Sequence, residues 1–498
     1  MLLDIETFGS IDAESDSNLL NYFYETPIAA KLLEYEKSIV IGRKGSGKTA
    51  LYKYIQSKDK DKASALLFQH YPWKVHDRFK NSNTSERESY LNAWIFFFYI
   101  EIFKRLIKLE SNFSSKIAKK TIRQIKKWIK NNWGDVDFDH KNVLSPSATR
   151  RISCIFSPQI FGNSLGSLAF DKRDDSALGD TLGAINSKFS RVLDTLLECY
   201  DGHISLLFDE LDLSYSSNDR EYKNRLIGLL LAAYGFFTNE KLVKKIRIYL
   251  FLRSDIFNIL DFQDKNKIRD NMVVFLDWDA DSTISDLSLK NLVSSRIKAS
   301  VKSKTSEFNT NWNLIFDQAK IGKNQFKWNY ITDRTFIRPR DYIKFINLAL
   351  DVAKKRIKLN SGQHEHIIND DIFAVRETYS AYLYEELKDE VFEKYNDFPH
   401  YFEILREVHV MTFDFEKFKD ALVKKNHLFS DRTVEPEVIL ARLYEFSVIG
   451  FYKSGGSSAG GAGYQYQYAS DYQPFNPKAQ LFRVHFGFKE YLNLVDSK

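Results

Sequence analysis

The sequence predicts an α/β protein whose parallel β-sheet carries a phosphate-binding loop at the end of its first strand. Three observations support this fold class. An apolar run at residues 38–41 is followed by a glycine-rich loop and then by a helical pattern. A second apolar run, residues 204–208, ends in two acidic residues. Further apolar runs at residues 65–68, 246–252 and 272–276 alternate with helical patterns, which is typical of a parallel sheet.

The glycine-rich loop fits the pattern G-x-x-x-x-G-K-[ST] without a mismatch. Glycines let consecutive backbone N–H groups point inward around phosphates, and the following helix directs its positive end at them. Lys48 would reach the β- and γ-phosphates, and Thr49 would hold Mg²⁺. The alternative, a chance glycine turn before a helix, is disfavoured because the strand and the helix are both present. The predicted nucleotide-binding residues are Gly42, Arg43, Lys44, Gly45, Ser46, Gly47, Lys48, Thr49 and Ala50.

The composition bounds the class of protein. A chain of 498 residues exceeds one ordinary domain, and 44% hydrophobic with 28% charged residues allows a large core. The net charge of +6 permits an anionic partner without requiring one. Two cysteines exclude a disulfide framework and lead us to expect a cytoplasmic protein. No signal peptide and no membrane span is expected from the hydrophobic pattern.

The N-terminal half carries a resemblance to a known family. The dipeptides Phe8-Gly9, Ala13-Glu14 and Tyr22-Phe23, followed by the loop, resemble a bacterial family of stand-alone P-loop ATPases. That family is similar to the AAA+/STAND/KAP (ASCE) branch, which supplies many switch proteins in phage defence. The resemblance implies an ASCE-type ATPase core over residues 30–280 that uses ATP and Mg²⁺. It also implies an N-terminal segment, residues 1–29, that packs on this core.

The strand at residues 204–208 is expected to lie beside the strand that precedes the loop. In the fold that the resemblance implies, Asp209 holds Mg²⁺, usually through water, and Glu210 polarises the attacking water. An apolar run that ends in Asp-Glu is by itself also compatible with an ordinary buried strand. Its position after a phosphate-binding loop favours the catalytic interpretation.

Two arginines near later strands have candidate roles by resemblance. Arg253 ends the strand at residues 246–252 and would sense the γ-phosphate; alternatively, it forms a structural ion pair with Asp255. Arg269 precedes the strand at residues 272–276 and would be an arginine finger that reaches a neighbouring subunit's nucleotide. Such a finger implies a homo-oligomer, whereas the alternative is an ordinary surface arginine.

Residues 281–378 have a helical pattern that resembles the lid of AAA+ and KAP ATPases. Pro339 and Arg340 precede a clear helix that runs through Leu350. By resemblance, Pro339 would touch the adenine or shape the turn, and Arg340 would be a sensor-2 arginine that closes on the phosphates. Proline at a helix start also has a purely structural explanation.

Residues 379–498 are expected to form a winged-helix-like domain. Two helices, at residues 413–425 and 436–446, precede two strands that are joined by a long glycine-rich wing, residues 453–479. A DNA-reading helix needs basic residues, but the second helix and its approach carry Glu435, Glu437 and Glu445 against Arg442 alone. A winged helix that contacts a protein partner fits better.

The most basic segment, residues 116–133, lies within an expected insert that spans about residues 104–178. Isoleucines recur in it at helical spacing, and seven lysines and arginines fill the rest without an acid. Such a helix could follow the phosphates of a nucleic acid, or it could be a solvated outer face that packs through its isoleucines. The sequence assigns no role to residues 134–178.

These features together predict an ATP-binding and ATP-hydrolysing molecular switch. By resemblance, we expect the sensor or regulatory ATPase of a bacterial antiviral defence system that acts with a separate effector protein. The alternative is a nucleic-acid-dependent motor or loader that uses residues 116–130. No guanine-reading N-K-x-D motif is present, which favours ATP over GTP without excluding GTP.

Overall fold

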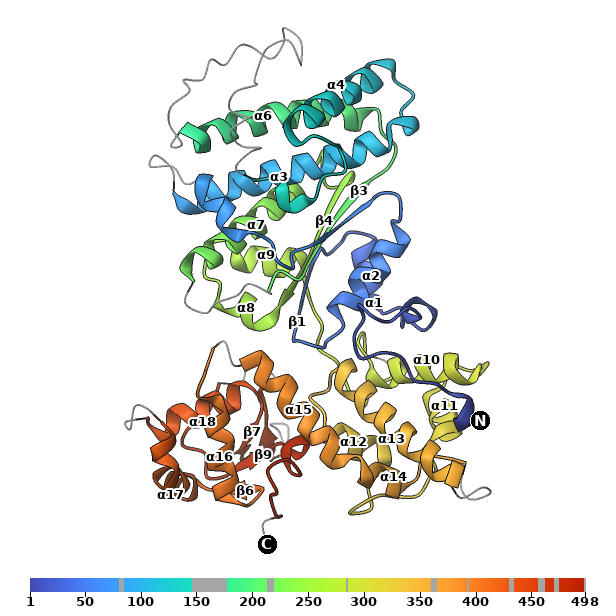
Figure 1. Ribbon diagram of the computed structural model, residues 1–498, viewed down its shortest axis with the longest axis vertical. Helices are drawn as coiled ribbons and strands as arrows, with labels where there is room; N and C mark the ends of the chain where they lie inside the picture. The colour runs from blue at the N-terminus through green and yellow to red at the C-terminus, as the bar shows by residue number, and fades with distance from the viewer. Residues whose placement is uncertain are drawn as a thin grey trace. The chain divides into compact units, whose positions relative to one another are not determined.

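The computed structural model divides the chain into two compact units, each with its own hydrophobic core (Figure 1). Unit 1 comprises Met1–Thr26, Lys44–Gly47 and Asp277–Lys498, and unit 2 comprises Pro27–Arg43 and Lys48–Leu276. The structure describes residues 1–79, 85–145, 177–212, 219–283, 285–359, 365–391, 394–429, 434–455, 462–469 and 474–496.

Unit 2 is built on a five-stranded sheet in which every neighbouring pair of strands is parallel. The strands lie in the order β2-β3-β4-β1-β5. All five are short and mostly apolar, as expected for a parallel sheet that is covered on both faces. This confirms the predicted α/β class and parallel sheet. The strands are β1 (Ile39–Gly42), β2 (Ala63–Leu67), β3 (Ile204–Asp209), β4 (Ile246–Arg253) and β5 (Val273–Phe275).

One expectation about this sheet is wrong. The acid-bearing strand β3 was expected beside the loop strand β1, but β3 pairs with β2 and β4. Strand β4 separates them, because β1 pairs with β4 on one side and with β5 on the other. The hydrophobic pattern of a segment indicates that it forms a strand, but it does not specify which other strand this strand pairs with.

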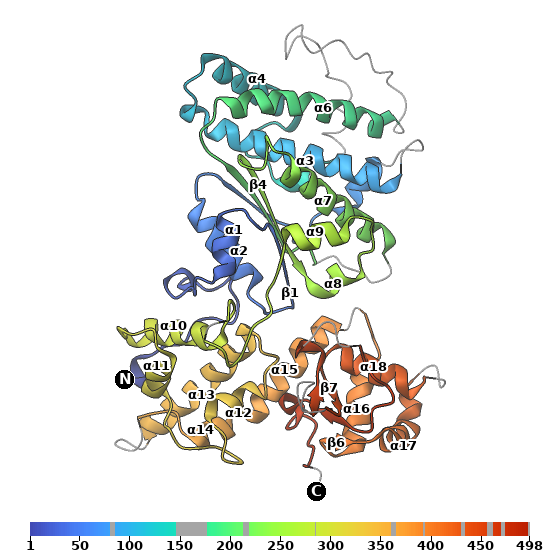
Figure 2. The same ribbon diagram turned by 180° about the vertical axis from the view of Figure 1, so that it is seen from behind.

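Helices cover both faces of the sheet in unit 2. Figure 1 shows α1 and α2 on one face and α3 and α7 on the other. A second helical layer, α4 and α6, packs on the side of α3 that is remote from the sheet, as both views show (Figure 2). The helices of unit 2 are α1 (Pro27–Leu33), α2 (Lys48–Lys58), α3 (Glu86–Lys108), α4 (Lys116–Trp133), α6 (Ala177–Glu198), α7 (Arg220–Thr238), α8 (Ser254–Ile259) and α9 (Lys265–Met272), with 3₁₀-helices η3 (Trp73–Phe79), η4 (Glu110–Asn112) and η5 (His140–Asn142).

Helix α3 shows how the sequence produces this layer. Ser85 caps its first turn by accepting a hydrogen bond from the Glu88 backbone N–H, and acidic residues in that turn suit the helix dipole. Its aromatic side chains, including Trp94 and Phe97, are fully buried. The phenylalanine-rich stripe of residues 93–103 is therefore core.

Unit 1 is mainly helical. Its helices come from the expected lid segment and from the C-terminal segment that follows. They are α10 (Leu289–Val301), α11 (Phe308–Ile315), α12 (Lys327–Thr332), α13 (Pro339–Leu359), α14 (Asn369–Ala374), α15 (Arg376–Val391), α16 (Phe398–Val408), α17 (Phe415–Lys425) and α18 (Pro436–Glu445), with 3₁₀-helices η1 (Leu2–Asp4), η2 (Leu19–Asn21), η7 (Asn426–Leu428), η8 (Gln467–Ala469) and η9 (Phe486–Phe488).

The C-terminal part of unit 1 also contains a small antiparallel sheet of order β6-β9-β7-β8. Strand β8 lies inside the segment that the sequence predicts as a long wing, and it pairs with β7. The glycine-rich residues 456–461 of that wing lie outside the described residues. The strands are β6 (Thr412–Phe413), β7 (Ile449–Lys453), β8 (Gly463–Gln465) and β9 (Phe482–Val484).

Most of the N-terminal segment, Met1–Thr26, belongs to unit 1, and the packing of residues 1–29 on the ATPase core stays a prediction. Leu2, Ile5 and Phe8 are buried in the hydrophobic core of unit 1. The Phe8 backbone N–H donates to Asn347 Oδ1 at 2.9 Å. Arg296 Nη1 donates to the Phe8 carbonyl at 2.8 Å. The buried apolar side chains and these hydrogen bonds hold the N-terminal segment against the other elements of unit 1.

Two findings bear on the remaining expectations. Most of the insert that has no assigned role lies outside the described residues, namely residues 146–176. Among the described helices, none is long and apolar enough to cross a bilayer.

Candidate functional site

The predicted phosphate-binding loop joins β1 to α2, as its strand–loop–helix pattern requires. Gly45 and Gly47 have φ angles of +80° and +99°, a backbone region that glycine adopts readily and other residues rarely do. Gly42 ends β1, and Ala50 lies in the first turn of α2. The glycine spacing of the motif therefore reflects backbone conformations that this turn needs.

Lys48 is the first residue of α2, and its side chain folds back over the loop. Its ammonium donates to the carbonyl oxygens of Gly42 at 3.0 Å and Arg43 at 3.1 Å. Burial lowers the pKa of Lys48, while the nearby carboxylates of Asp212 and Asp209 oppose that shift. The loop thus holds a cation close to its own backbone, where a phosphate would provide stronger anionic partners.

Asp209, the last residue of β3, is 3% exposed. It accepts hydrogen bonds from the Thr49 hydroxyl and the Glu210 backbone N–H. Burial raises the pKa of Asp209 to about 6, although these two bonds and the Lys48 ammonium act to lower it. Within the described part of the chain, Asp209 Oδ2 has no hydrogen-bond partner. A buried carboxylate oxygen in this state is a candidate ligand for a cation.

The donor set fits a magnesium ion. Mg²⁺ prefers hard oxygen ligands, and proteins hold it through one or two carboxylates together with substrate phosphates. The Thr49 hydroxyl and the Asp209 carboxylate both offer oxygen atoms as metal ligands, and they are hydrogen-bonded to each other. They lie at adjacent ends of α2 and β3. The two residues predicted as metal ligands are therefore brought together.

Glu210 follows Asp209 with a φ angle of +60°. A residue with a side chain pays a conformational cost in this left-handed region, of the order of 1–3 kcal/mol, and such residues concentrate at functional sites. The strained position coincides with the predicted general base.

Arg253 ends β4, and the strand register places it directly opposite Gly42, where the loop begins. Its guanidinium makes a two-pronged contact with Asp255, with Nε–Oδ1 at 3.0 Å and Nη2–Oδ2 at 2.7 Å. Nη1 also lies 3.5 Å from Asp212 Oδ2. The ion pair with Asp255, which was the structural alternative for Arg253, is therefore present, and it holds the arginine beside the loop.

Arg269 is partly exposed in the last turn of α9. Its guanidinium lies 5.4 Å from the centroid of the Phe275 ring. The position of Arg269 at the end of a helix that precedes β5 agrees with the sequence prediction. The arginine-finger role requires a second subunit and stays a prediction.

Pro339 and Arg340 belong to unit 1, which also includes loop residues 44–47. Pro339 is buried as the first residue of α13. The Arg340 backbone N–H donates to Gly45 O at 3.4 Å, and a Cβ on Gly45 would lie 3.0 Å from Arg340 Cβ. Arg340 Nη1 donates to Glu386 Oε2 at 3.0 Å, and the Lys44 ammonium lies 3.6 Å from the same oxygen. Arg340 thus packs against the loop tip with a carboxylate as its partner.

The sequence reasoning missed two side chains that hold the loop tip. Arg338 Nη1 donates to Lys44 O at 2.8 Å, and Arg338 pairs with the fully buried Asp341 through two contacts of 2.9 and 3.1 Å. Trp278 Nε1 donates to Ser46 O at 2.8 Å. The Arg-Pro-Arg-Asp run contains an arginine and an aspartate three residues apart on a helix start, and this spacing could have identified the Arg338 ion pair.

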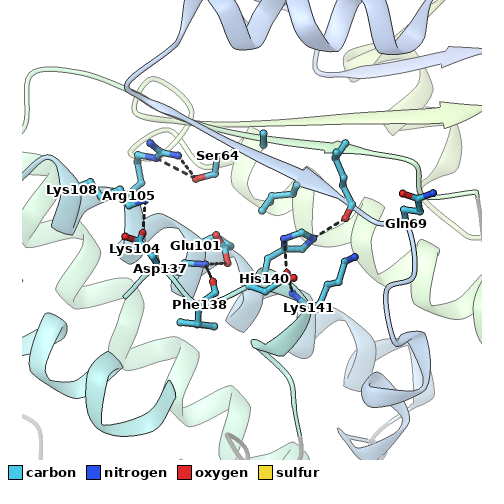
Figure 3. Close-up of a pocket in the computed structure, with 14 residues that line it drawn as sticks. Ser64, Gln69, Glu101, Lys104, Arg105, Lys108, Asp137, Phe138, His140 and Lys141 are labelled. Atoms are coloured by element: carbon cyan, nitrogen blue, oxygen red, sulfur yellow. Dashed lines mark hydrogen bonds and ion pairs between the residues drawn. The ribbon is translucent and has the colours of Figure 1, made fainter. Parts of the chain in front are cut away.

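A separate pocket of about 440 Å³ lies between β2, α3 and residues 137–141 (Figure 3). Two of its lysines are paired within the pocket: Lys104 donates to Glu101 Oε1 at 2.8 Å, and Lys108 pairs with Asp137 at 2.5 Å. The His140 ring donates to Leu67 O at 2.9 Å. None of the predicted phosphate-binding residues lines this pocket, so it is distinct from the loop site.

Comparison with known proteins gave two findings. Residues 287–388, which span α10 to most of α15, match the FunZ-associated C-terminal helical domain. A protein of Escherichia coli (strain K12) that is named for the transposon gamma-delta and a mass of 80.3 kDa is 26% identical over 396 residues. The match covers 76% of this chain and 51% of that protein, so the chain spans about half the length of its relative. Neither name states an enzymatic activity.

Proposed function

We propose that the chain binds and hydrolyses ATP as a molecular switch. One observation carries the proposal: Lys48, Thr49, Asp209, Glu210 and Arg253 converge at the carboxyl ends of β1, β3 and β4. In open α/β sheets, ligands bind outside the carboxyl ends of the strands. The residue types are those that triphosphate hydrolysis needs, namely a cation, two oxygen ligands for a metal ion and a carboxylate as general base.

Each side chain has a role in this proposal. The Lys48 ammonium and the N–H groups of the loop bind the phosphates and neutralise their charge. Thr49 and Asp209 hold Mg²⁺, which when bound supplies charge neutralisation across the phosphates. Glu210 orients the attacking water and accepts its proton. Arg253, held by Asp255, faces the γ-phosphate and stabilises the charge that develops there.

The finer assignments belong to the same proposal. An ASCE-type core is supported by the glutamate that follows the acid at the end of β3. A winged-helix-like domain is supported by the order of α16, β6, α17, α18, β7, β8 and β9 along the chain. The roles of Pro339, Arg340 and Arg269, the homo-oligomer, the effector partner and the antiviral context rest on the resemblance to stand-alone P-loop ATPases.

Calorimetric titration with ATP and Mg²⁺ tests the proposal. The wild-type protein is expected to bind, and Lys48→Ala should weaken binding by at least about 10–10²-fold, because charge-assisted hydrogen bonds contribute about 1.5–3 kcal/mol. Lys60→Ala is the matched control, since Lys60 is an exposed lysine beyond the end of α2. Absence of binding by the wild type, or equal binding by Lys48→Ala, would overturn the proposal.

A nucleic-acid-dependent motor or loader is the second candidate. It shares the ATP site and differs in requiring a nucleic-acid surface. The observation that favours it is the basic helix α4, whose exposed cations are described below. Stimulation of ATP hydrolysis by DNA or RNA would favour this candidate over a switch that works without nucleic acid.

A further inference from the structure

Helix α4 has two chemically distinct sides. Ser115 caps its start by accepting a hydrogen bond from the Ala118 backbone N–H, and Gly134, with a φ angle of +90°, ends it. Its apolar side chains pack into the core of unit 2, and these are Ile122, Ile125, Trp128 and Ile129. The opposite side faces solvent in the outer helical layer (Figures 1 and 2).

The solvent side carries all of the basic residues of the helix. At about 100° per residue, the seven cations fall within about 120° of the helix circumference. They extend over about 21 Å of helix axis at 1.5 Å per residue. The helix contains no acidic residue. The seven are Lys116, Lys119, Lys120, Arg123, Lys126, Lys127 and Lys130.

These charges are largely uncompensated. Arg123 pairs with Glu110 at 2.8 Å, but within the described residues none of the six lysines forms an ion pair. Several cations lie three or four positions apart, where like charges destabilise a helix. A surface that only needed solubility would carry both signs. Around α17, for example, Lys419 pairs with Glu416, and Lys424 and Lys425 pair with Glu407 of α16.

The charge of this surface indicates which kind of ligand would bind to the solvent side of α4. A line of cations about 21 Å long spans about six phosphates of one strand, which are spaced about 3.4 Å apart along a duplex axis. A membrane is a poor match, because a helix that binds a bilayer needs an accessible apolar face. Here that face is buried, apart from Ile117 near the first turn.

We propose that the solvent side of α4 binds the sugar–phosphate backbone of a nucleic acid, independently of base sequence. Contacts to phosphates position a protein on nucleic acid without reading its sequence. This inference goes beyond the proposed ATP switch and does not rest on it, since binding requires neither nucleotide nor hydrolysis.

Fluorescence anisotropy of the full chain with labelled 30-nucleotide single-stranded DNA, 30-base-pair duplex DNA and duplex RNA tests the proposal. Titrations from 50 to 300 mM KCl give the dependence of log K on log salt. The variant replaces Lys119, Lys120, Lys126 and Lys127 with glutamine, a good helix former. We expect the slope for duplex DNA to become less steep by about 3.6 and the affinity at 100 mM salt to fall by up to about 10³-fold.

Two matched variants keep the test decisive. Replacing the same four lysines with arginine should retain binding, because the charges remain. Replacing Lys417, Lys419, Lys424 and Lys425 of α17 with glutamine changes the net charge equally and should leave binding within about twofold of wild type. The proposal is overturned if no probe binds, if both glutamine variants bind alike, or if vesicles with phosphatidylserine or poly-glutamate bind more tightly than every nucleic acid.

Discussion

Neutralising Asp209 should stabilise the nucleotide-free protein, although it removes a residue that the proposed function needs. The Asp209 carboxyl is buried, and its pKa is raised from 3.8 to about 6. A shift of about two pKa units corresponds to about 3 kcal/mol of preference for the protonated form. Asn at this position cannot ionise, and its side-chain oxygen can still accept a hydrogen bond from the Thr49 hydroxyl. We therefore expect Asp209→Asn to stabilise unit 2 by about 1–3 kcal/mol at pH 7.5.

The pH dependence of stability shows whether ionised Asp209 stabilises or destabilises the fold. The folded state holds the Asp209 proton more tightly than the unfolded state, so this residue lowers stability as pH rises from about 4 to about 6. The penalty is complete above about pH 7, is about half as large at pH 5.0, and is absent only below the unfolded pKa of 3.8. Asp209→Asn should thus stabilise the protein fully at pH 7.5 and by about half as much at pH 5.0.

Differential scanning calorimetry without nucleotide or Mg²⁺ measures this effect. A unit of about 250 residues shifts its melting temperature by about 2–4 °C per kcal/mol, so we expect a rise of several degrees at pH 7.5. Asp212→Asn is the control, because Asp212 is a quarter exposed and pairs with Arg253. A melting temperature of Asp209→Asn at or below wild type at pH 7.5, or an equal gain at both pH values, would refute the reasoning.

Two further predictions concern stability. Glu210→Gly should stabilise the nucleotide-free protein by about 1 kcal/mol because glycine adopts a φ angle of +60° without strain, whereas Glu210→Ala should not; equal melting temperatures would contradict this. Arg338→Ala should destabilise unit 1 by about 3–5 kcal/mol because it leaves Asp341 charged and fully buried, and adding Asp341→Asn should recover part of the loss; chemical denaturation measures both, and no recovery would count against the ion pair.

Local chemistry made part of the site predictable. The loop motif specifies its own conformation, because Gly45 and Gly47 adopt backbone angles that other residues rarely do. The strands could also be recognised one by one from short apolar runs, and Asp209 and Glu210 from their position at the end of the run that forms β3. These features depend on neighbouring residues in the chain, and the sequence contains them directly.

Features that depend on distant segments were not predictable. The insertion of β4 between β1 and β3 reflects packing of whole strands, which hydrophobic pattern does not encode. The burial of Phe8 in the core of unit 1 depends on Asn347 and Arg296, which lie about 300 residues away in the chain. Arg338 was overlooked in favour of Arg340 because two arginines flank one proline, and only the tertiary structure shows which one contacts Lys44 O.

The most direct test of the proposed function separates binding from turnover in one variant. Glu210→Gln keeps the size and backbone conformation of the residue but cannot accept a proton. We expect this variant to bind ATP and Mg²⁺ with an affinity close to that of the wild type, while phosphate release from ATP falls by at least about 10²-fold. Phosphate release at the wild-type rate would contradict the assignment of Glu210, and wild-type protein that binds ATP without releasing phosphate would contradict hydrolysis itself.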